Sequence, residues 1–106
     1  MTEQEREELK AKLIELGFWD ADDPGDPTIE HQCSQALHLS LENKLATDLF
    51  LSAANFTGDS AISRVEVIHG ANNYLLATAG NTTEAMCLAA LALPEFLLQH
   101  PECAAE

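Results

Sequence analysis

The chain has 106 residues and carries 18 acidic against 5 basic side chains, for a formal net charge of −13. This length predicts one domain, residues 1–106, and the apolar fraction of 46% excludes wholesale disorder. The charge disfavours general binding to nucleic acid or anionic membranes and favours basic protein surfaces, although solubility alone would also explain it. No long apolar run or basic, hydrophobic leader is present, so we expect a cytoplasmic protein without a membrane segment.

The first predicted element is a helix over about residues 2–16. Thr2 and Glu5 have the spacing of a capping box at its start, and Gly17 suits its C-terminal cap. Its early positions are acidic and its later positions include lysines, which complements the helix dipole. One apolar stripe is expected to face the core: Leu9, Leu13 and Leu16.

Two aromatic residues, Phe18 and Trp19, follow this helix directly. They suit an anchor that holds the end of the helix on the core. Trp19 could instead contact a partner, because tryptophan is enriched at binding hot spots. Both interpretations stay open for Trp19.

An acidic loop follows over residues 20–27, where two prolines and a glycine exclude a helix or a central strand. Its spacing partly matches a calcium-binding loop that starts at Asp20, but Pro24 and His31 stand at two ligand positions, so we expect no calcium site. No lysine or arginine occurs in residues 13–43. The loop is either simply solvated or presents a strip of carboxylates that imitates phosphates. The candidate strip comprises Glu15, Asp20, Asp22, Asp23, Asp26 and Glu30.

A second helix is predicted over about residues 29–46, with Thr28 as its cap. Its apolar residues recur every four positions: Ile29, Cys33, Leu37, Leu41 and Leu45. Residues 48–54 could extend this helix or form a strand, and we favour the strand slightly.

A β-hairpin is predicted over residues 63–79, with turn residues at 70–73. A third helix then follows over about 82–93, because Asn81 and Glu84 have capping-box spacing. We expect Pro94 to kink or break it and residues 95–99 to form a separate short helical turn. The fold class is therefore α+β, a small antiparallel sheet packed with helices.

No catalytic motif is present, and we expect neither an enzyme nor a bound cofactor. His31 with Cys33 and His100 with Cys103 have ligand-like spacing, but neither pair matches a usual zinc pattern, so no metal site is predicted. Cys33 falls on the apolar stripe of its helix, where a small buried thiol is the commoner explanation. The three cysteines are expected to be reduced.

The segment Thr82-Thr-Glu-Ala-Met-Cys-Leu-Ala-Ala-Leu91, placed after two predicted strands, resembles the helix that follows the twisted antiparallel sheet of phage ABA-sandwich domains. That resemblance covers about the last two-thirds of the chain and implies no functional residues. Together with the acidic opening of residues 1–27, the whole chain also looks similar to small phage-encoded anti-CRISPR proteins, particularly inhibitors of type I-E systems. This second resemblance implies inhibition by stoichiometric binding.

We therefore expect a phage counter-defence protein that binds a host type I CRISPR-Cas effector, or its DNA-bound complex, and blocks target binding, nuclease recruitment or cleavage without catalysis. The acidic strip with Trp19 would contact a basic protein surface. A variant places the contact on exposed nucleic acid, through Lys10, Lys12, Lys44 and Arg64. The alternative from another class is a phage accessory or structural protein. The chain could be a monomer or a homodimer joined through the sheet edge or the alanine-rich helix.

Overall fold

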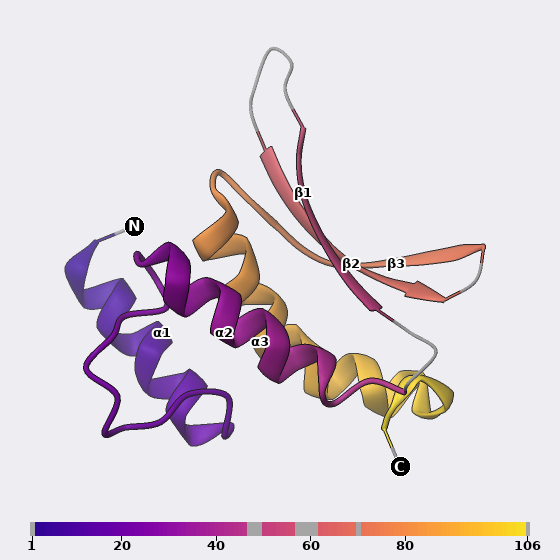
Figure 1. Cartoon of the computed structure of the whole chain (residues 1–106), viewed down its shortest axis with the longest axis horizontal. Helices are drawn as coiled ribbons and strands as arrows, with labels where there is room; N and C mark the ends of the chain where they lie inside the picture. Colours follow the sequence, from indigo (N-terminus) through magenta and orange to yellow (C-terminus); the bar gives the residue numbers. More distant parts are fainter. Residues whose placement is uncertain (1, 47–49, 57–61, 70, 106) are drawn as a thin grey trace.

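The computed structural model describes residues 2–46, 50–56, 62–69 and 71–105, which form three α-helices and one antiparallel sheet (Figure 1). The strands lie in the order β1-β2-β3, so consecutive strands are neighbours. The α+β prediction is confirmed. In chain order the elements are α1 (Glu3–Glu15), α2 (His31–Glu42), β1 (Phe50–Phe56), β2 (Ile62–His69), β3 (Asn72–Ala79), α3 (Thr82–Gln99) and the 3-10 helix η1 (Pro101–Cys103).

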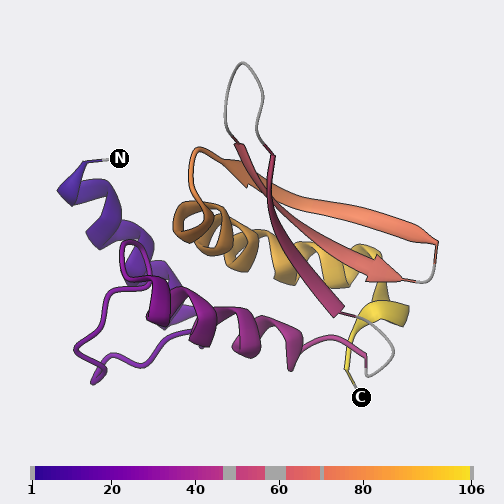
Figure 2. The ribbon, with the colours of Figure 1, turned by 45° about the horizontal axis from the view of Figure 1, so that its top comes forward.

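The helices lie on one side of the sheet, as Figures 1 and 2 show. Helix α3 packs against β2 and β3, and α1 and α2 pack against α3. The opposite face of the sheet is not covered by any of the described helices. Helix α3 is therefore the element that both the sheet and the other two helices contact.

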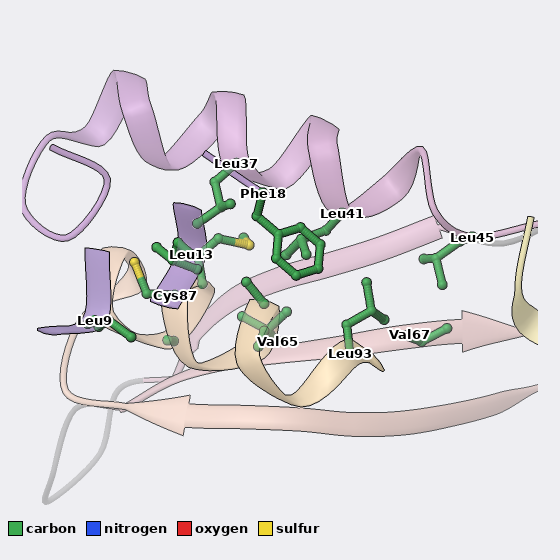
Figure 3. Close-up of a cluster of buried hydrophobic side chains, with 14 of the residues drawn as sticks. Leu9, Leu13, Phe18, Leu37, Leu41, Leu45, Val65, Val67, Cys87 and Leu93 are labelled. Carbon is green, nitrogen blue, oxygen red and sulfur yellow. The ribbon is translucent and has the colours of Figure 1, made fainter. Parts of the chain in front are cut away.

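The hydrophobic core fills the space between α3, the inner face of the sheet and the other two helices (Figure 3). Alternation along β2 points Val65 and Val67 inward, and both are fully buried. Small side chains on α3, Ala85, Ala89 and Ala90, are also fully buried and let its neighbours approach closely. The larger buried side chains from the helices and the loop after α1 are Leu9, Leu13, Phe18, Leu37, Leu41, Met86 and Leu93.

Helix α1 has both of its predicted caps. The Thr2 hydroxyl oxygen accepts a hydrogen bond from the Glu5 amide at 3.1 Å. At the other end Gly17 has a φ of 83°, and the Phe18 amide donates to the Leu13 carbonyl at 2.9 Å. This pattern is a Schellman motif, in which the buried Phe18 and Leu13 make the accompanying apolar contact. The cap thus directs the chain so that the Phe18 side chain lies in the core.

Helix α2 is shorter than predicted at both ends. It begins at His31 with Glu30 as its N-cap, and the Thr28 hydroxyl donates to the Asp26 carboxylate instead of capping the helix. Ile29 is 58% exposed, because the turn at Asp26 places it before the helix and outside the apolar stripe. Beyond Glu42 the chain leaves the helix, and Leu45 forms an isolated β-bridge with Ala104.

The third predicted strand is present as β1, over Phe50–Phe56. Residues 48 and 49 of that prediction lie outside the described residues, as does Gly70 of the predicted turn. The turn is tighter than expected, since His69 pairs with Asn72 and both asparagines of the predicted turn belong to β3. Between β2 and β3 the register shifts, so that Leu76 is an extra residue opposite the Val65–Glu66 step.

The predicted break at Pro94 is wrong, because α3 continues through it from Thr82 to Gln99. Pro94 is exposed, whereas Leu93 is fully buried and Phe96 packs against the core. Apolar packing on both sides of the proline offsets the hydrogen bond that it cannot donate. The N-terminal cap is as predicted, with the Asn81 side chain accepting from the Glu84 amide at 2.8 Å.

Gly17 and Gly80 offer a matched test of the α1 cap. An added Cβ would meet nothing within 4 Å at either position, but only Gly17 has a positive φ. We expect Gly17→Ala to lower the free energy of unfolding by about 1–2 kcal/mol through backbone strain alone. Gly80→Ala should change it by less than about 0.5 kcal/mol. Urea unfolding of both variants measures the difference, and equal effects would contradict the assigned cap.

Candidate partner-binding site at the acidic loop

The candidate carboxylates lie at the C-terminal end of α1 and on the connection to α2, at the end of the molecule away from η1 (Figures 1 and 2). Five of them are exposed and Asp26 is half-buried. The exposed five are Glu15, Asp20, Asp22, Asp23 and Glu30. The structure therefore keeps the predicted acidic segment on the surface, but its members have different roles.

The second half of the loop is a folded turn in which carboxylates accept internal hydrogen bonds. The Asp26 side chain accepts from the Thr28 amide at 2.9 Å and from the Thr28 hydroxyl at 2.5 Å. The Asp26 carbonyl accepts from the Ile29 and Glu30 amides, and the Glu30 carboxylate accepts from the Asp26 amide. Pro27 is fully buried within this turn. Residues 26–30, here called the anchored turn, are thus fixed to the body of the protein.

A buried thiol joins the anchored turn to α3. The Cys87 sulfhydryl donates to the Pro27 carbonyl at 3.3 Å, and Cys87 is fully buried. Burial raises the pKa of Cys87 from 9.0 to about 12, with smaller contributions from the negative charges of Asp26 and Glu84. The thiol therefore stays protonated at neutral pH and keeps its hydrogen bond to the turn.

The first half of the loop carries its carboxylates outward. Asp20 accepts from the Asp22 amide at 2.9 Å, and Asp23 accepts from the Gly25 amide at 2.8 Å. These local turns order the backbone while leaving the side chains exposed. No hydrogen bond or ion pair involves the carboxylates of Glu15 or Asp22 within the described ranges. The exposed carboxylates Glu15, Asp20, Asp22 and Asp23 are here called the outward acidic segment.

Gly25 and Cys33 meet where the loop crosses the start of α2. A Cβ at Gly25 would clash with the Cys33 sulfur, so the close approach requires glycine. Cys33 is half-buried rather than buried, which corrects the expectation from its apolar stripe. Its thiol lies 3.7 Å from the Glu30 carboxylate, and burial followed by the Glu30 charge raises its pKa.

The aromatic pair after α1 packs inward. Phe18 is buried, and the Lys44 ammonium lies 5.2 Å from the centre of its ring. Trp19 is half-buried and packs against the core, and its indole N–H is buried with no hydrogen-bond partner in the part of the chain that the structure describes. The predicted anchoring of the helix end is therefore observed. A contact between Trp19 and a partner stays a prediction.

The four cations of the nucleic-acid variant are not gathered on one face. Lys10 and Lys12 belong to α1, where Lys12 lines a groove with Glu5, Glu8 and Glu84. Arg64 lies on the uncovered face of the sheet, across α3 from α1, and its guanidinium is 3.1 Å from the Glu66 carboxylate. The remaining cation is Lys44, which follows α2 and lies over Phe18.

Neither histidine–cysteine pair assembles a metal site, since no three potential ligands come together among the described residues. His31 contacts Gln35 at 3.2 Å, and His100 lies 3.4 Å from Glu102. His100 packs against Tyr74 and Phe96, at 4.8 Å between ring centres in each case, and its contact with Tyr74 was not predictable from the sequence. The i,i+4 spacing of Phe96 and His100 does predict a contact between those two side chains.

No protein-family model matches the chain, and neither curated proteins nor solved structures contain a match to it. Among the described residues no helix is long and apolar enough to cross a membrane.

Asp26 and Asp22 allow the anchored turn to be tested at constant charge. Alanine at either position removes one negative charge, but only Asp26→Ala removes the acceptor for the buried Thr28. We expect Asp26→Ala to lower the free energy of unfolding by about 1–2 kcal/mol and Asp22→Ala to change it by less than about 0.5 kcal/mol. Equal values in chemical denaturation would show that the turn does not depend on this carboxylate.

The raised pKa of Cys87 predicts a loss of stability in alkali. Above about pH 9 the unfolded chain releases the thiol proton while the folded chain retains it, so the unfolded state is favoured. The Cys87→Ser variant is the reference, because its hydroxyl can still donate to Pro27. Relative to it, the free energy of unfolding of the wild type should fall by up to about 1.4 kcal/mol per pH unit between about pH 9 and pH 11. Parallel urea unfolding curves measure this difference. Identical pH dependence of the two proteins would contradict it.

Proposed function

We propose that this protein is a non-catalytic counter-defence inhibitor, an anti-CRISPR, that occupies a DNA-binding surface of a host type I CRISPR-Cas effector. The observation that carries the proposal is the outward acidic segment, whose four exposed carboxylates lie beside the anchored turn. No lysine or arginine occurs in this part of the chain, residues 13–43. Surfaces that hold DNA phosphates are rich in lysine and arginine, and carboxylates are their natural competitors.

The local turns of the loop order its backbone before a partner binds, which favours high affinity. Because Asp20 and Asp23 already hold the backbone through the Asp22 and Gly25 amides, little conformational freedom remains to be lost on binding. The net charge of −13 adds long-range steering toward a basic partner. Binding should therefore be fast and should weaken as the salt concentration rises.

The position of the cations favours a protein partner over direct contact with the DNA strand. Arg64 is engaged with Glu66, and Lys12 lies among three glutamates. A continuous basic groove, which single-stranded DNA requires, would need these cations on one face. We therefore assign the contact to the effector protein and expect no shift of single- or double-stranded DNA in a gel.

The test reverses two charges that the fold does not use. Glu15→Lys combined with Asp22→Lys changes the outward acidic segment but breaks no hydrogen bond of the loop. In bacteria with a type I-E system targeting an infecting phage, wild-type protein should restore plaque formation. The double variant should lower the restored plating efficiency at least about tenfold, because the reversed charges would be repelled by a basic surface.

The control is Glu3→Lys combined with Glu7→Lys, which makes the same change in net charge at exposed positions of α1. This variant should inhibit like the wild type if the acidic loop makes the contact. Equal loss of inhibition in both variants would show that inhibition depends on net charge and not on the acidic loop. Full activity of the loop variant would refute the assigned contact, and failure of the wild type to restore plaques would refute the inhibitor function for that system.

A further inference from the structure

Strand β3 is an open edge of the sheet without the usual protection against pairing. It pairs with β2 on one side, and no described strand lies on its other side. Its eight residues, Asn72–Ala79, contain no charged side chain and no proline. Natural edge strands usually carry lysine, proline or a covering segment, whereas β3 has only the bulge at Leu76.

A shallow groove runs between this edge and the second half of α3. Its volume is about 260 Å³, and its lining includes Leu75, Leu76 and Phe96 together with Ala92, Glu95 and Gln99. Two leucines of these elements are unusually exposed, Leu75 at 53% and Leu98 at 83%. Edge and groove together form the β3 edge surface, which combines free backbone groups with apolar side chains.

The charge distribution identifies what can cover this surface. The three strands carry only two formal charges, and these neutralise one another in the Arg64–Glu66 pair. Residues 1–46 carry 11 of the 18 acidic side chains, so two copies repel each other most strongly where α1 or the acidic loop would meet. The β3 edge surface holds one carboxylate, Glu95, and offers a basic partner little attraction. A second copy of the chain can approach here with the least repulsion.

We infer that two copies of the protein associate through β3, antiparallel and about a two-fold axis, to form a continuous six-stranded sheet. Such an interface is self-complementary, because each copy offers the same free edge to the other. It would satisfy backbone groups of both strands and bury Leu75 together with the groove beside Phe96. Since α3 packs beneath β3, the second halves of the two α3 helices would lie next to each other below the joined sheet.

This association should respond to salt in the opposite sense to binding of a basic partner. Two chains of charge −13 repel each other, and salt screens that repulsion, so the dimer should strengthen as salt is added. The inhibitor contact proposed above should weaken under the same conditions. Dimerisation of the purified chain is independent of that function, so either proposal can fail alone.

Sedimentation equilibrium of the purified chain tests the inference. At about 0.5 M NaCl and millimolar protein the mass should approach about 23 kDa, twice the 11.5 kDa of one chain, and it should fall on dilution and at low salt. Leu75→Lys should raise the dissociation constant at least about tenfold, although it lowers the net negative charge. Circular dichroism establishes that the variant folds; if it does not, Thr78→Lys, also exposed on β3, replaces it.

Ile62→Lys is the matched control. Ile62 is 40% exposed on β2, away from the edge, and the substitution changes the charge by the same amount. Its dissociation constant should stay within about twofold of the wild type. A wild-type chain that remains monomeric at every concentration and salt would overturn the inference. So would equal weakening by Ile62→Lys, which would indicate pairing of sheet faces instead of edges.

Discussion

Burial of α3 on two opposite sides is the constraint on which the rest of the structure depends. One side of this helix packs under β2 and β3, and another receives α1 and α2. A helix in this position must be apolar around most of its circumference, and small residues must allow its neighbours close. Ala85, Ala89 and Ala90 meet that need, while Met86 and Leu93 fill the remaining space. Because both layers share this helix, neither has a complete core without it.

The same constraint explains where sequence reasoning succeeded and where it failed. Caps depend on a few neighbouring residues, and those at Thr2, Gly17 and Asn81 were predictable for that reason. Continuation of α3 through Pro94 depends on apolar contacts with distant segments, which no local pattern contains. The predicted start of α2 was wrong for a related reason. The Thr28 hydroxyl donates to the Asp26 carboxylate and therefore does not cap the helix.

For the candidate acidic site, the sequence predicted which part of the chain carries exposed carboxylates but not what each one does. A lack of lysine and arginine in residues 13–43 marks the region, and exposure of Glu15, Asp20, Asp22 and Asp23 agrees with it. The division between the outward acidic segment and the anchored turn could not be foreseen. It depends on the Cys87 thiol, which is 60 residues from Pro27 in the chain and reaches its carbonyl only in the folded protein.

That division has a consequence for how the surface can evolve. Side chains of the outward acidic segment are exposed and, among the described residues, accept hydrogen bonds only within their own turn, whereas Asp26, Pro27 and Thr28 are tied to the core. Substitutions at Glu15 or Asp22 change what the surface presents at little cost in folding free energy. Such a loop can alter its charge pattern while its attachment to the core is inherited intact. Cys87, buried in α3, thereby holds the anchored turn in place while the neighbouring outward acidic segment can vary.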